Sequence, residues 1–296
     1  MIKDSHIGTH VMRKVLVTGA SGQLGQALRE QSIHFRNFEY LFLSRNDLDI
    51  TIKANIASTI VQYQPDIIIN TAAYTAVDAA EDDKEQAYLI NHKAALYVAQ
   101  ACKDKNIAYI HISTDYVFDG TSITPYTEDV LSNPQTVYGA SKLAGEQAII
   151  DTHLNSFAIV RTSWVYSVYG HNFVKTMLRL GKERDSLSVV NDQLGCPTWA
   201  NDLADAILVI AKNLQEHNSG LYHYSNAGKA TWYDFAQAIF EYTKMDVSVF
   251  PVTSDLFPTQ AKRPSNSVLN TDKLAAQFQI NIPNWKDSLH KMLNTL

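Results

Sequence analysis

Tyr138 and Lys142 are the two side chains of this sequence best suited to passing a proton to a ligand. Residues four apart lie on one face of a helix. A phenol has a pKa of about 10, and we expect the ammonium of Lys142 to lower the pKa of Tyr138. Such a phenol is a suitable general acid toward a carbonyl oxygen. The Y-x-x-x-K spacing is common by itself, so its surroundings decide whether it marks a site.

Thr114 and Asp115 supply a second candidate group, directly after a predicted strand at residues 108–113. In doubly wound sheets, ligands bind outside the carboxyl ends of the strands. The hydroxyl of Thr114 could bond a substrate oxygen that gains charge, and Asp115 could orient a sugar hydroxyl. Both residue types also cap ordinary loops, so this reading depends on a ligand site being nearby.

A glycine-rich turn with glycines at positions 19, 22 and 25 indicates such a site. It follows a predicted buried strand at 14–18 and opens a predicted helix at 23–31. Glycine permits a tight turn and close approach of the backbone to a pyrophosphate, and a helix N-terminus supplies free amides and partial positive charge. A tight turn without a ligand would look similar, but its place in the first βα unit favours a dinucleotide.

The end of the second predicted strand, at 40–44, bears on the choice of cofactor. An NAD-type site has an acid there to bond the ribose hydroxyls. Here Ser44 and Arg45 follow the strand instead, and Arg45 could meet a 2′-phosphate, although it could equally be a solvated surface arginine. We therefore favour NADPH, with NADH as the alternative.

Together, the G-x-x-G-x-x-G turn, the threonine at a strand end and the Y-x-x-x-K pair resemble the extended short-chain dehydrogenase/reductase family. Longer segments narrow the resemblance to its dTDP-4-dehydrorhamnose reductase branch, at residues 65–78, 113–120, 161–166, 191–198 and 263–267. The resemblance runs from about residue 12 to the C-terminus. It implies NAD(P)H-dependent reduction of the C4 ketone of dTDP-4-dehydro-β-L-rhamnose to dTDP-L-rhamnose, the last step of dTDP-rhamnose biosynthesis for surface polysaccharide.

The resemblance also implies roles for particular residues. Tyr138 would donate the proton, Lys142 would support it and hold ribose, and Thr114 would complete the catalytic set. Thr114, Asp115 and Trp164 would contact the sugar, and Arg263 would bind the nucleotide diphosphate unless it only forms a surface ion pair. The cofactor contacts that the resemblance implies are Gly22, Gln23, Leu24, Asp49, Ile50, Ala73, Tyr74, Thr75, Ile112, Tyr138 and Lys142. The glycine turn adds Gly19 and Gly25, and the end of the second strand adds Ser44 and Arg45.

Two departures from the branch affect the cofactor and the assembly. Some members have an aspartate where Ser44 stands, so its absence supports NADPH. Some bacterial members form a dimer through magnesium held by glutamates, where this chain has Ala27 and Asn201. Magnesium needs oxygen-rich anionic ligands, so a structural magnesium is doubtful and we predict no metal. Monomer and homodimer both stay open.

Four other functions are possible on the same fold. Dehydratases follow the catalytic threonine with two acids, but here Asp115 is followed by Tyr116. An epimerase would recycle its nicotinamide, and other nucleotide-sugar reductases differ in a few substrate contacts. A non-catalytic regulator similar to the β subunit of methionine adenosyltransferase is the alternative from another class.

Positioning these residues requires strands that alternate with helices, which indicates a parallel sheet. We predict an α/β Rossmann-like doubly wound fold with a smaller mixed α/β C-terminal lobe. A helix is expected at 85–104, then a strand at 108–113, a helix at 139–152 and a strand at 157–161. The predicted parts are an N-terminal extension at 1–12, a cofactor domain at 13–162 to which 190–215 returns, and a substrate lobe at 163–296.

Composition limits the remaining classes. With 25 basic and 30 acidic residues among 296, the net charge of −5 argues against a dedicated nucleic-acid binder. Two cysteines, Cys102 and Cys196, do not form a disulfide framework. No apolar run reaches the roughly 18 residues of a membrane span, and the N-terminus lacks the apolar centre of a signal peptide. These features predict a cytoplasmic protein that binds small molecules.

Overall fold

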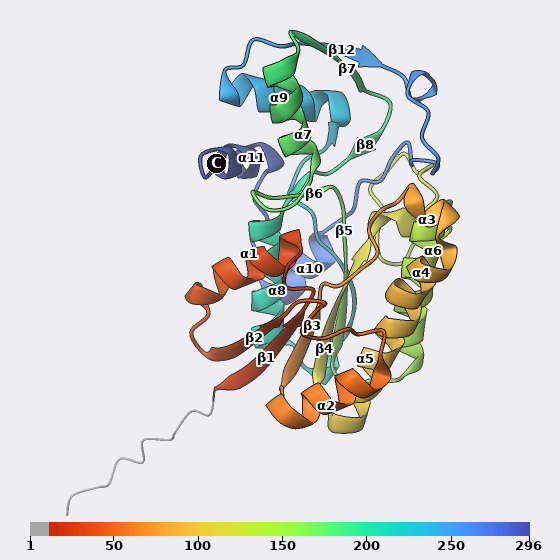
Figure 1. The fold of residues 1–296 in the computed structure, drawn as a ribbon, viewed down its shortest axis with the longest axis vertical. Coiled ribbons are helices and arrows are strands. Elements are labelled where there is room, and N and C mark those ends of the chain that lie inside the picture. The colour runs from red at the N-terminus through yellow and green to blue at the C-terminus, as the bar shows by residue number, and fades with distance from the viewer. Residues whose placement is uncertain (1–11) are drawn as a thin grey trace, which may run out of the picture.

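The computed structural model describes residues 12–296, so the predicted extension at 1–12 lies outside the described residues except for Met12. Its centre is a six-stranded parallel sheet in the order β10-β5-β4-β3-β1-β2 (Figure 1). The strands are β1 (Arg13–Thr18), β2 (Phe38–Leu43), β3 (Ile67–Asn70), β4 (Ala108–Thr114), β5 (Phe157–Thr162) and β10 (Gly220–His223). The order reverses direction between β1 and β3, which creates the crevice where ligands bind in open α/β sheets. The predicted doubly wound fold is confirmed.

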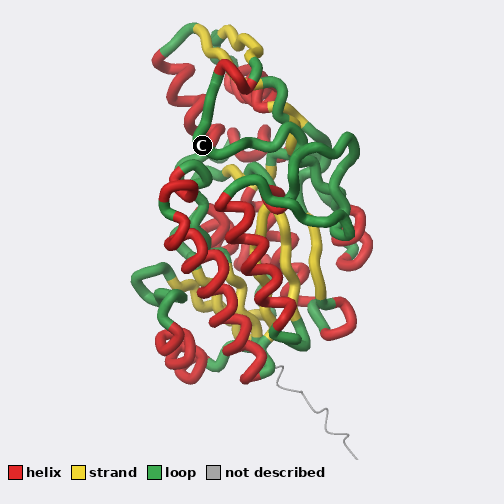
Figure 2. The backbone as a smooth tube through the Cα atoms, turned by 90° about the vertical axis from the view of Figure 1, so that its right-hand side faces the viewer, coloured by secondary structure: helices red, strands yellow, loops and turns green. Residues whose placement is uncertain are grey.

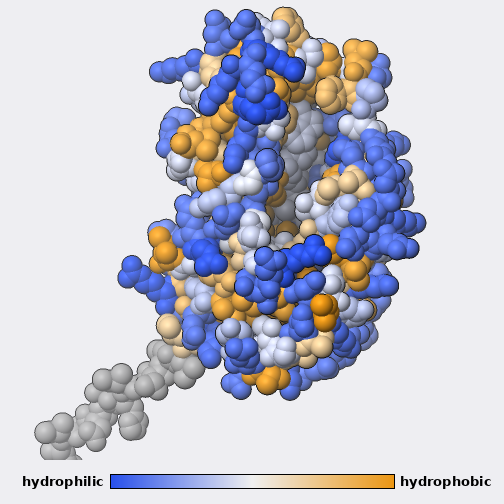
Figure 3. All heavy atoms as spheres, viewed as in Figure 1, coloured by the Kyte–Doolittle hydropathy of each residue, from blue (hydrophilic) through white to orange (hydrophobic). Residues whose placement is uncertain are grey.

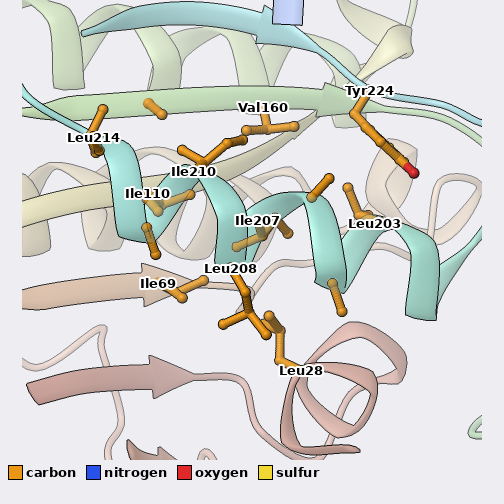
Figure 4. Close-up of a cluster of buried hydrophobic side chains, with 14 of the residues drawn as sticks. Leu28, Ile69, Ile110, Val160, Leu203, Ile207, Leu208, Ile210, Leu214 and Tyr224 are labelled. Atoms are coloured by element: carbon orange, nitrogen blue, oxygen red, sulfur yellow. The ribbon is translucent and has the colours of Figure 1, made fainter. Parts of the chain in front are cut away.

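One face of the sheet is covered by α1 (Gln23–Gln31), α8 (Ala200–Asn213) and α10 (Asp272–Phe278). Strand residues alternate between faces, so Val15 and Val17 pack on this side. In Figure 4, α8 places its apolar side chains against Ile69, Ile110 and Val160 of three neighbouring strands. The apolar runs of these strands fit a sheet that is buried on both sides.

The opposite face is covered by α2 (Lys53–Tyr63), α5 (Ala95–Lys105) and α6 (Val137–Asp151). Figure 2 shows the long helices of this layer lying in front of the strands. Tyr109 of β4 faces this layer, together with Leu16 and Ile68 of the neighbouring strands. Residues 111 and 113 share the same face as Tyr109, because side chains repeat every second residue along a strand.

The single helix predicted at 85–104 is wrong in its middle. The structure has α3 (Ala79–Asp82), α4 (Lys84–Tyr88), a π-helical segment (Leu89–Ala94) and then α5. A β-carbon at Gly145 of α6 would overlap the carbonyl oxygen of Asn91, so the π segment and α6 approach closely. Insertions of this kind are frequent at functional sites, and the helix-like sequence pattern of residues 85–104 does not distinguish them from a regular turn.

Strand β10 was not predicted, and it comes from the part of the chain assigned to the substrate lobe. It pairs with β5 in parallel and forms one edge of the sheet. Helix α8, within the segment predicted to return to the first domain, packs in the same core. The division at residue 162 stays a prediction, and the structure adds that two later segments complete the sheet layer.

The C-terminal lobe contains α7 (Phe173–Glu183), α9 (Trp232–Thr243), α11 (Trp285–Leu293) and three short strand pairs. The pairs are β12 (Ser248–Val252) with β7 (Ser186–Val190), β9 (Thr198–Trp199) with β6 (Val165–Tyr166), and β11 (Ala230–Thr231) with β8 (Leu194–Gly195). Buried Phe235 and Trp285 belong to its core. Figure 3 shows the surface hollowed between this lobe and the part that holds the sheet.

Among residues 12–296, no helix is both long and apolar enough to cross a bilayer. Cys102 and Cys196 are both free thiols buried in the structure.

Candidate active site

The turn after β1 has the geometry of a phosphate cradle. Gly19 has a φ of +69°, and a β-carbon there would lie 2.6 Å from the amide nitrogen of Ala72 in the loop after β3. A β-carbon at Gly25 would lie 2.5 Å from the carbonyl oxygen of Gly19. Gly22 is different, because it is exposed, its φ is −74°, and an added β-carbon would meet only the Gly19 oxygen at 3.3 Å. The surrounding protein would accommodate a β-carbon at residue 22 with little adjustment. A glycine at this position therefore fits close approach of a ligand to the backbone.

Helix α1 begins at this turn with no side-chain cap on its first amides. Free amides at a helix N-terminus bind phosphate well. Leu24 is buried in the core of the sheet layer, so only its backbone can serve a ligand. The side chain of Gln23 is also occupied elsewhere, since its Oε1 accepts hydrogen bonds from Ser167 at 3.0 Å and Asn172 at 2.9 Å. Gln23 therefore joins the phosphate turn to the C-terminal lobe, a contact that the motif did not reveal.

The loop after β3, with Ala73, Tyr74 and Thr75, lies beside the turn at the point where the strand order reverses. Asn91 of the π segment holds it from both sides, because the Tyr74 N–H donates to Asn91 Oδ1 at 2.9 Å and Asn91 Nδ2 donates to the Tyr74 carbonyl at 3.1 Å. Asn91 Nδ2 also donates to Ser141 Oγ at 2.9 Å. Asn91 thus connects the proposed cofactor loop to the helix that carries Lys142. Sequence reasoning missed it, since the π segment was read as ordinary helix.

The end of β2 is arranged as a small polar turn. Both the N–H and the hydroxyl of Ser44 donate to Asp47 Oδ2, at 2.9 and 2.6 Å. Asp49 accepts from the N–H and the hydroxyl of Thr51, and these bonds, with the nearby charge of Arg45, lower the pKa of Asp49. Arg45 is exposed, while Ile50 is 5% exposed and packs in the core. Arg45 is therefore the residue of this turn that has a free cationic side chain to offer a 2′-phosphate.

Tyr138 lies near the start of α6, where Thr136 caps the helix by accepting a hydrogen bond from the Gly139 N–H at 3.0 Å. The edge of the Tyr116 ring packs against Tyr138, with centroids 5.6 Å apart. Burial raises the pKa of Tyr138, and a hydrogen bond with the side chain of Thr114 acts in the opposite direction. The predicted lowering of this pKa by Lys142 is therefore wrong for the protein without cofactor. The phenol keeps its proton, as a proton donor must.

Lys142 is 1% exposed and points toward β4. Its Nζ donates to the carbonyl oxygen of Ile112 at 2.5 Å and lies 3.1 Å from Nε2 of His111. Burial lowers the pKa of Lys142 to about 8, while the charge of Glu146 acts to raise it. Lys142 is thus fixed by β4 rather than by the Tyr138 phenol. His111 lies next to a predicted cofactor contact, Ile112, but nothing in its spacing marked it for the site.

Asp115 is 2% exposed, and the hydroxyl of Thr114 donates to its Oδ1 at 3.0 Å. Its other oxygen, Oδ2, is buried without a hydrogen-bond partner among the described residues. Burial raises the pKa of Asp115 to about 6, with the Ser267 and Thr114 side chains acting against it. A buried carboxylate oxygen with no partner fits the predicted role of accepting a hydrogen bond from a sugar hydroxyl.

Trp164 follows β5 with a φ of +47°, a left-handed conformation that is uncommon for a bulky residue. Its ring stacks on Trp232 with centroids 3.5 Å apart and planes 5° apart. Trp232 comes from α9, far along the chain, and the sequence carried no signal for this pairing. Strained backbone of this kind is common at ligand sites, which fits the predicted contact of Trp164 with the substrate.

Arg263 crosses between the C-terminal segment and the sheet part. Its Nη2 forms an ion pair with Asp78 Oδ2 at 2.5 Å, and its Nη1 donates to the Tyr116 hydroxyl at 2.8 Å. The ion pair that the sequence analysis gave as the alternative role of Arg263 is present. It lies beside Tyr116, which contacts Tyr138, so Arg263 is also close to the candidate site. Diphosphate binding by Arg263 stays a prediction.

The two positions at which some family members have magnesium-binding glutamates are buried in this protein. Ala27 is fully buried beneath α8, and Asn201 is 6% exposed. Within residues 12–296 there is no group of three His, Cys, Asp or Glu side chains that could hold a metal ion. The doubt about magnesium stays a prediction of the sequence.

The glycine cradle, the uncapped start of α1 and the exposed Arg45 fit a phosphorylated dinucleotide, and Tyr138, Thr114 and Lys142 stand at the carboxyl end of the same sheet. This fold and site define a Rossmann-fold oxidoreductase of the short-chain dehydrogenase/reductase type. A family model described as "RmlD substrate binding domain" matches residues 12–296. The chain belongs to the dTDP-4-dehydrorhamnose reductase family.

Three similar proteins illustrate the family. The dTDP-4-dehydrorhamnose reductase of Sinorhizobium fredii is 42% identical over 95% of this chain and 96% of its own length. The dTDP-4-keto-6-deoxy-D-glucose reductase of Streptomyces niveus is 39% identical over 93% of this chain and 94% of its own. The crystal structure of the Bacillus anthracis dTDP-4-dehydrorhamnose reductase, in complex with NADP, is 40% identical with a TM-score of 0.91, and the match covers 97% of this chain and 100% of that one.

Proposed function

We propose that this protein reduces the C4 ketone of dTDP-4-dehydro-β-L-rhamnose to dTDP-L-rhamnose with NADPH, as the last step of dTDP-rhamnose biosynthesis. The observation that carries the proposal is that α6 sets Tyr138 and Lys142 against the end of β4, at the same sheet edge as the glycine turn. There Lys142 bonds the Ile112 carbonyl and the Tyr138 ring packs on Tyr116, two residues after Thr114. The names of the relatives and the NADP complex of a similar structure support it. They favour an enzyme over a regulatory subunit or an epimerase.

NADPH, when bound, would supply the hydride that reduces the ketone. The amides at the start of α1 would hold its pyrophosphate, and the guanidinium of Arg45 its 2′-phosphate. The loop at Ala73, Tyr74 and Thr75 would line its middle, held by Asn91. The β4 end at Ile112 and the amine of Lys142 would face its nicotinamide ribose.

Tyr138 would donate its proton to the ketone oxygen, because an alkoxide is a far stronger base than a phenolate and takes the proton even from a phenol whose pKa is raised. The Thr114 hydroxyl would bond the same oxygen as it gains charge. Asp115 would accept a hydrogen bond from a sugar hydroxyl through its free Oδ2. Trp164 would pack on the sugar, and Arg263 would pair with the diphosphate.

The test is a panel of sugar nucleotides with the purified full chain, in which oxidation of NADPH or NADH is followed by absorbance. We expect turnover with dTDP-4-dehydro-β-L-rhamnose, a higher kcat/KM with NADPH than with NADH, and dTDP-L-rhamnose as product. dTDP-glucose, which has no ketone, is the control and should consume no cofactor. Equal or better turnover of the 4-keto-6-deoxy-D-glucose nucleotide would reassign the substrate, and no turnover of any ketone would reject the proposal.

We also propose that the protein acts in the cytoplasm, where free thiols such as those of Cys102 and Cys196 persist. Both a monomer and a homodimer fit this proposal, and light scattering of the purified protein would distinguish them.

A further inference from the structure

A line of buried polar side chains crosses the sheet from the glycine-rich turn to Lys142. The strand register places Thr18 beside Asn70, and Asn70 beside His111. Tyr109 shares a face with His111, two residues earlier on β4. Thr18 is 2% exposed, Asn70 and His111 are each 1% exposed, and Tyr109 is fully buried. The mechanism proposed above uses Lys142 but none of these four residues.

The orientation of the Asn70 amide follows from its backbone partner. Its Oδ1 accepts from the N–H of Ala72 at 3.2 Å and from the Thr18 hydroxyl at 2.6 Å. A backbone N–H can only donate, so the amide oxygen must lie on that side. The Asn70 NH2 group therefore faces β4, where it donates to the Tyr109 hydroxyl at 3.1 Å and lies 3.2 Å from Nδ1 of His111.

Two donors thus converge on Nδ1 of His111. One is the Asn70 amide, and the other is the Tyr109 hydroxyl at 3.2 Å, which keeps its proton because burial raises the pKa of Tyr109. Burial, together with the charge of Lys142, lowers the pKa of His111 well below its usual range, so the ring is neutral with one N–H. With donors on the Nδ1 side, Nδ1 accepts and the ring proton belongs on Nε2.

Nε2 of His111 faces Nζ of Lys142 at 3.1 Å. An Nε2–H can donate to the lone pair of an amine. An ammonium has no lone pair to accept that hydrogen bond, so the Nε2–H and the ammonium N–H groups would repel each other. For Lys142 to be an ammonium that donates to Nε2, the proton of His111 must instead be on Nδ1, with the Tyr109 oxygen as its acceptor. The partners of His111 therefore favour the amine form of Lys142, and the ammonium form requires the other tautomer of the ring.

We propose that His111 is a positioning residue, which holds the side-chain nitrogen of Lys142 through Nε2 and couples the loss of a proton from Lys142 to a change of its own tautomer. One proton leaves the ammonium for solvent, and the ring proton of His111 changes from Nδ1 to Nε2, so the pair releases one proton in total. The role of Lys142 toward ribose rests on the proposed function, whereas the coupling itself does not.

The other ionisable groups around Lys142 come from α6, β4 and β5. On α6, Tyr138 lies one turn before it, and Glu146 one turn after it, where Glu146 pairs with Arg161 of β5 at 2.6 Å. On β4, Tyr109 and His111 are the groups already described. Glu146 acts to raise the pKa of Lys142, and burial lowers it to about 8.

The experiment follows the ionisation of Lys142 by NMR of the cofactor-free full chain with 13C-labelled lysine. The Lys142→Met variant assigns the Lys142 signal by its loss. We expect His111→Asn, which removes Nε2 but keeps a polar group near Nδ1, to raise the titration midpoint by about half a pH unit or more. Tyr109→Phe leaves the Asn70 amide as a donor to Nδ1 but removes the acceptor for an Nδ1 proton, so it disfavours the ammonium form more than the amine form and should lower the midpoint instead.

Opposite shifts in the two variants would support the coupling, because general loosening of the core would move both midpoints in the same direction. Unchanged midpoints, or shifts of the same sign, would overturn it. Tyr109→Phe conserves the ring and serves if His111→Asn does not fold. Because no substrate is used, this result is separate from the sugar-nucleotide assay, and either can fail alone.

A cofactor readout completes the test. The affinity for NADPH is measured by quenching of tryptophan fluorescence from pH 6.5 to about 9.5. The dissociation constant should rise as the pH passes the titration midpoint of Lys142, and the pH of this rise should shift in the variants as the midpoint does. An NADPH affinity whose pH dependence is the same in both variants and the unmodified protein would remove Lys142 and His111 from cofactor binding.

Discussion

The indole of Trp164 lies flat on that of Trp232, with ring centroids 3.5 Å apart, although 67 residues separate them and Trp164 adopts a left-handed backbone conformation. Gly195 closes the third side of this pair, because a β-carbon there would lie 2.5 Å from the Trp164 ring. Trp164 is therefore held in place by contacts from two different segments of the C-terminal lobe.

Gly195→Ala should displace Trp164 without touching the cofactor cradle. We expect a stability loss of about 1–3 kcal/mol from overpacking, a higher KM for the sugar nucleotide, and an unchanged dissociation constant for NADPH. Steady-state kinetics and fluorescence titration measure the two constants. An unchanged KM in a folded variant would exclude Trp164 from the substrate site.

Tyr138→Phe should abolish most turnover and keep cofactor binding. Loss of a general acid costs roughly 10²–10⁴-fold in kcat, and the ring of phenylalanine preserves the edge contact with Tyr116. Tyr116→Phe is the matched control, since it removes a nearby phenol that donates no proton in the proposed mechanism. If Tyr138→Phe kept near-normal kcat, the proton would have to come from another group.

Arg45→Ala should change the choice between cofactors. We expect kcat/KM with NADPH to fall about tenfold or more, because a lost ion pair with phosphate of about 1.4 kcal/mol corresponds to tenfold. The kcat/KM with NADH should change little. Arg36→Ala, another exposed arginine, is the control. Equal losses with both cofactors would argue against a 2′-phosphate contact.

Gln23→Ala should uncouple the two halves of the site. The Oε1 of Gln23 accepts hydrogen bonds from Ser167 and Asn172 of the C-terminal lobe, while its backbone belongs to the phosphate turn. Couplings between sites are commonly 5- to 150-fold, or about 1–3 kcal/mol. We expect saturating dTDP to improve the affinity of the unmodified protein for NADPH, and the Gln23→Ala variant to lose most of that improvement. Gln26→Ala is the control, because Gln26 bonds Ser21 within the turn. Preserved coupling in Gln23→Ala would contradict this role.

Asp205→Asn should stabilise the protein at neutral pH. Burial, and next the charge of Asp202, raise the pKa of Asp205 from 3.8 to about 6. A carboxyl with a raised pKa favours folding when protonated, so its contribution is full below pH 3.8 and is lost as the pH rises through about 6. After a discount for solvent screening, we expect a gain of about 1 kcal/mol at pH 7.5, with no gain near pH 3.5. Thermal unfolding at both pH values measures it, and Asp104→Asn on the open surface is the control. Equal gains at both pH values would show a cause other than ionisation.

Local patterns predicted much of the fold. The helix expected at 23–31 matches α1, because the glycine turn marks its start, and the strands at 14–18, 108–113 and 157–161 agree with β1, β4 and β5 to within one residue. Strand β10 was missed because four residues from Gly220 to His223 carry little periodicity, and only pairing with β5 makes them a strand.

Candidate site residues that belong to a sequence motif could be predicted, whereas those brought to the site only by tertiary packing could not. Tyr138, Lys142 and Thr114 belong to recognisable spacings. His111, Asn91 and Trp232 are brought to the site by strand register, by a π segment and by a distant helix, respectively. The electrostatic expectation for Tyr138 was wrong for a related reason, since burial, which depends on the whole fold, raises the pKa of Tyr138, and Lys142 bonds β4 instead of the phenol.

The edge strand β10 has a consequence for how the protein is made. Until residue 223 has been synthesised, β5 has an unpaired edge, and until α8 at 200–213 is in place, the apolar face of three strands is bare. A nascent chain of which only the first 162 residues have left the ribosome therefore exposes apolar surface and an unpaired strand edge, both of which favour aggregation. We therefore expect the sheet layer to complete its fold only when α8 and β10 have joined it, and a fragment that ends at residue 162 to associate through its uncovered apolar face.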